Sequence, residues 1–337
     1  MRDVRSLAER IAAEHEQEAR TSGLSPERPA RRHPIFERRT SRDLANREPY
    51  IHERTPTGTK VLHPASAPVT ALEPVMRACS GVWVAHGAAA RTGDGRRARS
   101  PAVPPGEESP AACSAWVWMT EEEENGYYYG FSNEGLWPLC HAAHARPIFR
   151  LEDWEHYVAV NRKSSPMPYA RRSTSDEPII LVQDYHFALA PKMIREKLPR
   201  ATILTFWHIP WPNAERIGIC PWHDEIIAGL LGSSIVGFHT QQHCNNFIDS
   251  VDAFMESRID REANAVVQGA RRTLVRPYPI SIEWPVHWMD GIATVAECRA
   301  ALRRELGLSP DALLGVGIDR LDYTKGVEER LQAVDSP

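Results

Sequence analysis

The sequence predicts an α/β fold built on a doubly wound parallel sheet. From residue 178 onward, short apolar runs alternate with helical patterns of about 10 to 15 residues, which is typical of repeated βαβ units. The apolar runs are continuous, as in parallel strands that are buried on both faces. Polar side chains follow several of these runs, at the edge where such sheets bind ligands.

The predicted elements follow one another in a regular order. The first strand is "PIILVQ" at 178–183, and the helical pattern "FALAPKMIREKL" comes after it. Further strands are expected at 201–207, 233–238, 272–282 and 313–318. Helices are expected between them at about 222–231, 240–256 and 292–306.

The first part of the chain is less regular. Residues 1–45 alternate Arg, Glu and Ser with little apolar content, which predicts a poorly ordered leader. Residues 90–113 are rich in Pro, Gly, Ala and Arg, which predicts a long surface loop.

Composition excludes several classes of function. The 337 residues are 42% hydrophobic and 25% charged, with a net charge of -4, so the chain has the composition of a soluble globular protein without the basic field that binds nucleic acid. The six cysteines form no CxxC pair, which indicates reduced thiols. Without a membrane span or a secretory signal in the sequence, we expect a cytoplasmic protein with no membrane partner. A homo-oligomer remains an open alternative.

Two polar residues stand directly after predicted strands. Asp184 either caps the following helix or accepts a hydrogen bond from a sugar hydroxyl. His208 is either a structural histidine or a catalytic one, and Pro210 and Pro212 stiffen the loop that carries it. Aromatic rings with a few polar groups suit a sugar ligand.

The aromatic segment "YYYGFSNEGLWPLCHAAH" at 127–144 also has two interpretations. It is either packing in the core or at an interface, or one wall of a small-molecule site. His239 and His243 have the i, i+4 spacing of two zinc ligands on a helix, but no third ligand is near in sequence. We therefore expect no metal and a solvated or capping role for these histidines.

The stretch "GIDRLDYTKG" at 317–326 is the most specific signal. Its charges either pair with one another on the surface, which stabilises little, or they bind a ligand. An Arg and a Lys five positions apart after a buried strand can converge on a diphosphate. If Asp319 and Asp322 pair elsewhere, Arg320 and Lys325 are left for that ligand.

Five motifs, taken in order, resemble those of the trehalose-6-phosphate synthases, glycosyltransferase family 20. They are "VQDYH", "FWHIPWP", "SIVGFHT", "YPISIEW" and "DRLDYTKG". The resemblance implies a GT-B fold, in which two Rossmann-like domains enclose the site. Residues 46–285 would form the acceptor-side domain, and residues 286–337 a linker helix and the first strand of the nucleotide-sugar domain.

The resemblance also implies a reaction and its acceptor site. The family transfers glucose from UDP-glucose to glucose 6-phosphate with retention of configuration and without a metal ion or other cofactor. Arg47 and Tyr128 match residues that hold the acceptor phosphate, and Trp137 and Asp184 match residues that line the acceptor sugar. The preceding segment "FERRTSRDL" carries charges where the family has an apolar first strand.

The donor site follows from the same resemblance. His208 matches a histidine that contacts the donor glucose, and Arg320 and Lys325 match the cations on the UDP diphosphate. Negative charge grows on the diphosphate as the glycosidic bond breaks, and fixed cations stabilise it. The implied catalytic set is Asp184, His208, Arg320 and Lys325.

Two departures from the family suggest that this chain is impaired. Ala67 and Pro68 stand where the family has a glycine pair near the donor phosphates, and proline offers no N–H there. The sequence stops at Pro337, before most of the nucleotide-sugar domain expected from the resemblance. Two alternatives stay open: a related transferase that uses glycerol 3-phosphate or an aminocyclitol phosphate as acceptor, or a non-catalytic fragment that binds a sugar phosphate.

Overall fold

The structure is a computed structural model. It describes residues 41–47, 51–55, 58–62, 82–86, 102–103, 112–142, 145–166, 177–279, 291–309 and 311–335. The expectations for residues 1–40, for Ala67 and Pro68, and for most of the loop at 90–113 lie outside these ranges.

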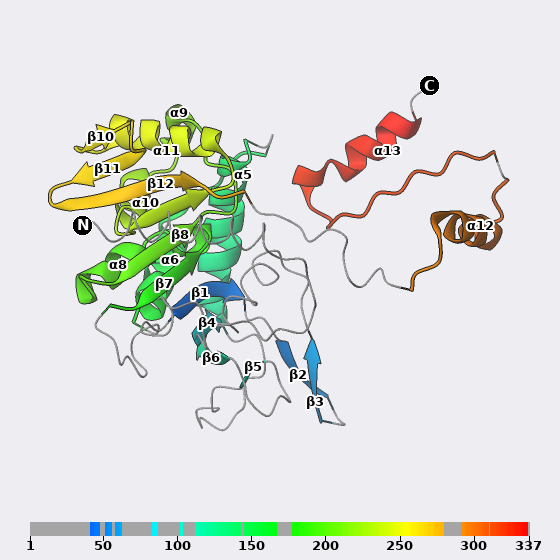
Figure 1. Ribbon diagram of the computed structural model, residues 1–337, viewed down its shortest axis with the longest axis horizontal. Helices are drawn as coiled ribbons and strands as arrows, with labels where there is room; N and C mark the ends of the chain where they lie inside the picture. Colours follow the sequence, from blue (N-terminus) through cyan, green and yellow to red (C-terminus); the bar gives the residue numbers. More distant parts are fainter. Residues whose placement is uncertain are drawn as a thin grey trace, which may run out of the picture.

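Ten strands form one sheet in the order β10-β11-β12-β9-β8-β7-β1-β4-β6-β5 (Figure 1). Every pair from β12 to β6 is parallel, whereas β5, β10 and β11 pair in the antiparallel direction. The α/β fold predicted from the sequence is confirmed, but the sheet, which was predicted to be parallel, is mixed and mostly parallel. The strand bounds are β1 Ser41–Arg47, β4 Val82–His86, β5 Ala102–Val103, β6 Ala112–Val117, β7 Ile179–Gln183, β8 Thr202–Phe206, β9 Ile235–Phe238, β10 Arg258–Asp260, β11 Ala265–Gln268 and β12 Arg271–Pro277. A separate hairpin joins β2 Ile51–Thr55 to β3 Gly58–Leu62.

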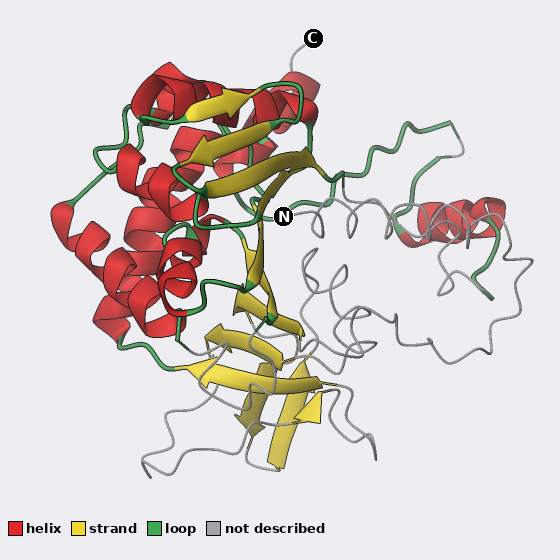
Figure 2. Ribbon diagram, turned by 60° about the vertical axis from the view of Figure 1, so that its left-hand side comes forward, coloured by secondary structure: helices red, strands yellow, loops and turns green. Residues whose placement is uncertain are grey.

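The helices that pack on the sheet lie between its strands in sequence, and in Figure 2 most of them stand to the left of the yellow strands. Their bounds are α4 Glu121–Glu124, the π-helix η1 Asn125–Leu136, α5 Trp137–Cys140, α6 Leu151–Ser164, the 3-10 helix η2 Tyr185–Phe187, α8 Ala190–Lys197, α9 Ala214–Ile217, α10 His223–Leu230 and α11 Gln241–Phe254. The predicted runs at 178–183, 201–207 and 233–238 contain β7, β8 and β9. None of the described helices is both long enough and apolar enough to cross a bilayer.

The central strand β1 departs from the sequence-based expectation. The leader was expected to extend to residue 45, but the structure begins β1 at Ser41 and pairs it with β4 on one side and β7 on the other. Arg42 and Asp43 are 1% and 0% exposed within this strand. Leu44 supplies the apolar contact to the core cluster of Val84 and Ile180, and pairing on both sides satisfies the backbone.

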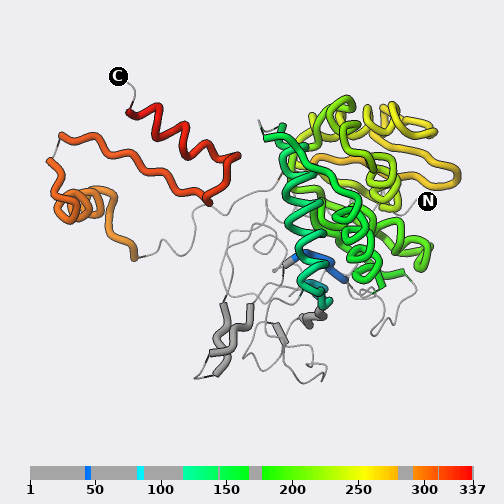
Figure 3. The backbone as a smooth tube through the Cα atoms, turned by 180° about the vertical axis from the view of Figure 1, so that it is seen from behind, coloured from blue at the N-terminus to red at the C-terminus, as the bar shows by residue number. Residues whose placement is uncertain are grey.

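The C-terminal part also differs from the expectation. The predicted helix is present as α12 Val295–Glu305, and α13 Val327–Asp335 ends the described chain. Residues 311–320, however, have no regular structure, and the side chain of Leu313 is fully exposed. A strand needs a neighbour for its backbone hydrogen bonds, and no described strand pairs with this segment. Figure 3 shows the orange and red segments standing apart from the sheet.

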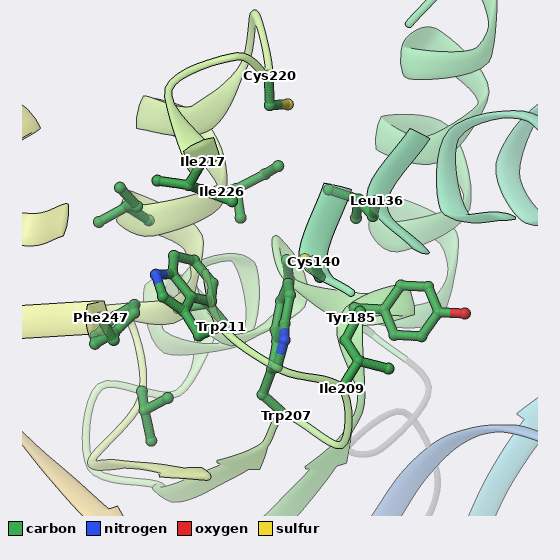
Figure 4. Packing of buried hydrophobic residues seen from close by; sticks show 14 of the residues in the cluster. Leu136, Cys140, Tyr185, Trp207, Ile209, Trp211, Ile217, Cys220, Ile226 and Phe247 are labelled. Atoms are coloured by element: carbon green, nitrogen blue, oxygen red, sulfur yellow. The ribbon is translucent and has the colours of Figure 1, made fainter. Parts of the chain in front are cut away.

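The main hydrophobic core lies beside the ends of β8 and β9 (Figure 4). Trp207 and Trp211 are fully buried, and their rings meet edge to face at 4.9 Å. Nε1 of Trp211 donates to Oγ of Ser250 at 3.0 Å, so its polar atom is satisfied. Because His208 stands between these two anchored tryptophans in the chain, its loop has a rigid base.

Candidate active site at the edge of the parallel sheet

The strand order reverses between β1 and β7. From β1 the chain moves outward to β4 and β6, then returns to β7 on the other side of β1 and continues to β8, β9 and β12. Ligands of doubly wound sheets bind outside the carboxyl ends of the strands at such a reversal. The residues at these two ends are Asn46 and Arg47 on β1, and Gln183 with Asp184 on β7.

Asp184 has an unusual backbone. Its φ of 73° and ψ of 171° fall in a region that is populated almost only by glycine and that costs about 1–3 kcal/mol for other residues. Its N–H donates to the carbonyl of Phe206 at 2.7 Å, which ties β7 to β8. Strain of this kind persists where surrounding structure enforces it, and such places include ligand-binding sites.

The carboxylate of Asp184 uses one oxygen for the backbone. Oδ1 accepts the N–H of Tyr185 at 2.9 Å and the N–H of His208 at 3.1 Å. The capping interpretation is therefore correct, but Oδ2 receives neither of these bonds and lies 3.9 Å from Nδ1 of His186. Burial raises the pKa of Asp184 to about 7, against the opposing effect of the two N–H donors.

His208 lies next to Asp184. Its Nε2 is 3.1 Å from Oε1 of Gln183, and its ring meets Phe206 and His239 with centroids at 4.6 and 5.9 Å. Burial, with a smaller contribution from His239, lowers the pKa of His208 to about 4. The imidazole is therefore neutral at pH 7 and is suited to hydrogen bonding with a neutral sugar.

Arg47 ends β1 opposite His86 on β4, and its side chain lies outside the described residues. The neighbouring Asn46 is firmly held, because its Oδ1 accepts from Nδ1 of His86 and from the hydroxyl of Tyr127, each at 3.0 Å. Burial lowers the pKa of His86 to about 4, so this ring is also neutral. The carboxyl end of β1 is thus fixed by side chains from β4 and η1.

The aromatic residues predicted for the acceptor lie beside Asp184. Tyr128 stacks on His186 with centroids 5.5 Å apart and an interplanar angle of 11°, and His186 in turn approaches Asp184. The Trp137 ring lies 6.1 Å from the ring of Tyr185. Nε1 of Trp137 is buried and has no hydrogen-bond acceptor among the described residues.

One of the two predicted cations, Arg320, contacts this region from the C-terminal segment, and the other, Lys325, lies within electrostatic range of it. Cζ of Arg320 lies 5.9 Å from the centroid of the Trp137 ring, within the range of a cation–π contact. Asp322 and Lys325 act electrostatically on the pKa of His141, which burial lowers, and the ring of His141 is 4.0 Å from that of Trp137. Arg320 therefore lies beside Trp137, the first residue of α5.

The anions of this loop pair within the C-terminal segment. Oδ2 of Asp319 accepts from Nη2 of Arg330 at 2.6 Å, and Oδ1 of Asp322 caps η4 Tyr323–Lys325 by accepting from the N–H of Thr324 at 2.9 Å. Lys325 has no ion pair within the described part of the chain. Among the described residues, the ion-pair partner of Arg320 is Asp322 at a long 4.0 Å, and the Arg320 side chain is 73% exposed.

The site therefore joins some predicted residues directly and others through neighbours. Asp184 and His208 share a hydrogen bond, Tyr128 and Trp137 reach Asp184 through rings beside it, and Arg320 contacts Trp137. Sequence reasoning missed Asp43, Asn46, His86, Tyr127 and Gln183. Gln183 lies inside the motif "VQDYH" and Tyr127 begins the aromatic segment at 127–144, whereas nothing in the sequence distinguished Asp43, Asn46 or His86.

The two histidines with zinc-like spacing lie next to this region. His243 lies in the first turn of α11, and its N–H donates to Oγ1 of Thr240 at 3.3 Å. Within the described residues, no three His, Cys, Asp or Glu side chains are grouped so as to hold a metal ion.

Residues 40–336 match the family model of glycosyltransferase family 20. The chain is 37% identical over 306 residues to trehalose-6-phosphate synthase of Mycobacterium sp. (strain KMS), which covers 86% of this chain and 58% of the relative. It is 36% identical over 303 residues to the enzyme of that name from Mycolicibacterium smegmatis, with 86% and 57% covered. The chain thus spans somewhat under three fifths of these relatives.

Solved structures show the same fold. An alpha,alpha-trehalose-phosphate synthase (UDP-forming) from Burkholderia vietnamiensis superposes with a TM-score of 0.70 at 23% identity, covering 88% of this chain and 59% of the other. An E. coli trehalose-6-phosphate structure bound with UDP-2-fluoro glucose gives 0.69 at 21% identity, covering 87% and 60%. A Burkholderia xenovorans synthase in complex with glucose-6-phosphate gives 0.65 at 23% identity, covering 87% and 60%.

Proposed function

Because the chain belongs to glycosyltransferase family 20, we propose that its site serves glucose transfer from UDP-glucose to glucose 6-phosphate, giving trehalose 6-phosphate with retention of configuration. The relatives carry the name of this product, and two similar structures hold a UDP-glucose analogue and glucose 6-phosphate. The observation that carries the proposal is Asp184, which is held in a strained backbone at the strand reversal and is bonded to His208.

The acceptor side follows from the oxygen that Asp184 leaves unused by the backbone. In this proposal Oδ2 would accept from a hydroxyl of the acceptor glucose, and the N–H of Trp137 would donate to another. Arg47 and Tyr128 would hold the 6-phosphate, with Arg47 at the end of a strand fixed through Asn46. Charge-assisted bonds of this kind position an anion strongly.

The donor side rests on Arg320 and Lys325. During transfer the bond from the anomeric carbon of glucose to the phosphate oxygen of UDP breaks, and a bond from that carbon to the acceptor hydroxyl oxygen forms on the same face. The departing phosphate takes the hydroxyl proton. The two cations stabilise the charge that grows on the diphosphate, and neutral His208 contacts the donor sugar.

A product assay tests the acceptor. The chain is incubated with UDP-glucose and equal concentrations of glucose 6-phosphate and glycerol 3-phosphate, and the products are identified by mass spectrometry. We expect trehalose 6-phosphate as the main product and its loss in Asp184→Asn, which keeps the size of the side chain. A dominant glycerol product would assign the chain to the alternative acceptor class, and no product with either acceptor would contradict the transferase proposal.

We expect the transfer by this chain to be slow. The donor contacts that we assign on its C-terminal segment are two cations, and Arg320 is largely exposed to water, where charge pairs contribute little. Calorimetry should show weak binding of glucose 6-phosphate and still weaker binding of UDP-glucose. Sub-micromolar binding of UDP-glucose would show that the donor site lies elsewhere.

A further inference from the structure

His208 is linked to a fully buried carboxyl group by a single amide. Asp43 lies on β1 and is 0% exposed, and Gln183 lies at the end of β7 and is 5% exposed. Nε2 of Gln183 donates to Oδ1 of Asp43 at 3.0 Å, while Oε1 of the same amide is 3.1 Å from Nε2 of His208. Three side chains from the two strands at the reversal and the loop after β8 thus form one hydrogen-bonded chain.

The orientation of the Gln183 amide determines which ring nitrogen of His208 carries the proton. A glutamine amide has a donor end and an acceptor end. Since Asp43 takes the donor end, the acceptor end faces His208, and Nε2 of His208 must be the atom that donates. The other ring nitrogen, Nδ1, makes no hydrogen bond to any other described residue, and in the Nε2–H tautomer it is an acceptor.

We propose that Asp43 and Gln183 are positioning residues that hold His208 as the neutral Nε2–H tautomer and leave Nδ1 to accept a hydroxyl of the sugar ligand. The tautomer depends only on residues of the protein itself, and only the identity of the ligand rests on the proposed function. His208 would then accept a hydrogen bond from the sugar at one defined atom, Nδ1.

The energetics of Asp43 support a specific role. A carboxyl group buried in a central strand is costly unless it is well paired, and Oδ2 of Asp43 has no partner among the described residues. Its neighbours on the same face of β1 and β4 are apolar, namely Ala45, Trp83 and Ala85. An apolar residue would pack better at this position. What Asp43 contributes, and an apolar residue cannot, is an oxygen that accepts the hydrogen bond from Gln183.

The test is nuclear magnetic resonance on the full 337-residue chain labelled with ¹⁵N-histidine. Long-range ¹H–¹⁵N spectra separate protonated from unprotonated ring nitrogens, and the His208 signals are identified among the 14 histidines by their absence in His208→Asn. We expect a protonated Nε2 and an unprotonated Nδ1 at neutral pH. A signal for the Nδ1–H tautomer or for the charged ring would overturn the proposal.

Variants separate positioning from stability. Gln183→Leu removes the acceptor, and we expect the ratio of the two tautomers to fall about fivefold, as the loss of one net hydrogen bond implies. Gln183→Glu keeps an oxygen facing the ring and should restore the Nε2–H form. Asp43→Leu, which suits its apolar surroundings, should weaken the preference less than Gln183→Leu does. An unchanged tautomer in both leucine variants would overturn the proposal.

A matched control uses another buried polar pair of the same sheet. Oγ1 of Thr205 and Oγ of Ser233 are 2.7 Å apart and make no contact with the ring of His208. Thr205→Val should lower the thermal midpoint while leaving the His208 spectrum unchanged. Because the spectra need no turnover, absence of glucose transfer with the expected tautomer would reject the proposed function alone. A changed His208 spectrum in Thr205→Val would reject the positioning role.

Discussion

The backbone N–H of His208 donates to Oδ1 of Asp184 at 3.1 Å. This bond joins the loop after β8 to the first residue after β7, and the N–H of Asp184 returns a bond to Phe206 at 2.7 Å. The two strand ends are thereby locked to one another. The geometry of the proposed site depends on a residue whose backbone conformation suits glycine, which makes position 184 the first target for mutation.

Asp184→Gly and Asp184→Ala should differ in stability. Both lose the cap, which typically contributes about 0.5–2 kcal/mol, but only glycine adopts a φ of 73° without strain. We expect the glycine variant to have a free energy of unfolding higher than that of the alanine variant by about 1–3 kcal/mol. Urea denaturation of both variants measures this difference, and equal midpoints would mean that position 184 is unstrained. Neither variant should transfer glucose.

The buried carboxyl groups should make stability depend on pH. The pKa values of Asp43 and Asp184 are raised to about 8 and about 7, so between pH 4 and these values the folded state binds more protons than the unfolded state. Stability from these groups therefore falls as pH rises. His86 and His208, whose pKa values are lowered to about 4, act oppositely between pH 4 and 6.5.

Below pH 6.5 the effects of the two carboxyl groups and the two histidines on the pH dependence of stability largely cancel. Above pH 6.5 only the effect of the carboxyl groups remains. We expect the free energy of unfolding to fall between pH 6.5 and 8, with up to roughly 2 kcal/mol from Asp43. Asp43→Asn should remove most of this fall, as measured by urea denaturation at both pH values. An identical pH dependence in wild type and variant would show that Asp43 does not titrate in this range.

Lys325→Ala should slow catalysis more than it changes stability. A preorganised group at a site of developing charge contributes about 10²–10³ in rate, so kcat should fall by that factor while the melting temperature stays nearly constant. Lys163 on α6 is the control, since it pairs with Glu123 on α4 at 2.7 Å and its side chain is 41% exposed. Lys163→Ala should cost under about 1 kcal/mol of stability and leave kcat unchanged. Equal rates in both variants would make the loop at 319–325 an ordinary charged surface.

The contact between Trp137 and Arg320 should appear in donor binding. Exposed cation–π pairs are worth about 0.5–1 kcal/mol, so Trp137→Leu should raise KM for UDP-glucose about two- to fivefold, whereas Trp137→Phe should restore most of the affinity. Trp222, which stacks on Trp154 at 4.9 Å, serves as the control. Trp222→Leu should lower stability without changing KM, and a similar KM effect in both leucine variants would point to general loosening.

The sequence was most informative where its pattern was simple. The continuous apolar run before Asp184 identified β7, and the polar residue after it lies at the carboxyl edge of the sheet, where we propose the site. β1 could not be predicted in the same way, because Arg42 and Asp43 interrupt its apolar pattern although both are buried. Arg42 and Asp43 are buried because β1 pairs with β4 and β7, which are remote in sequence. No local sequence pattern reveals such pairing.

The opposite error occurred at residues 313–318. Their apolar pattern favours a strand, but a strand also requires a neighbour to pair with, and the described chain provides none. The π-helix at 125–136 was likewise beyond the pattern, since an apolar face does not distinguish a π-helix from an α-helix. Site residues that act through another side chain, such as Gln183, are visible only when the partner is in place.

The hydrogen bond between Gln183 and Asp43 closes a loop of 140 positions along the chain. Contacts of such long sequence separation form slowly, because the entropy of loop closure is lost before they are made. Residues 177–279 contain successive βα units that can associate locally, whereas β1 must find its place between β4 and β7. We therefore expect the docking of β1 to occur late in folding, so that a partly folded chain would have a formed β7–β9 region but no competent sugar site.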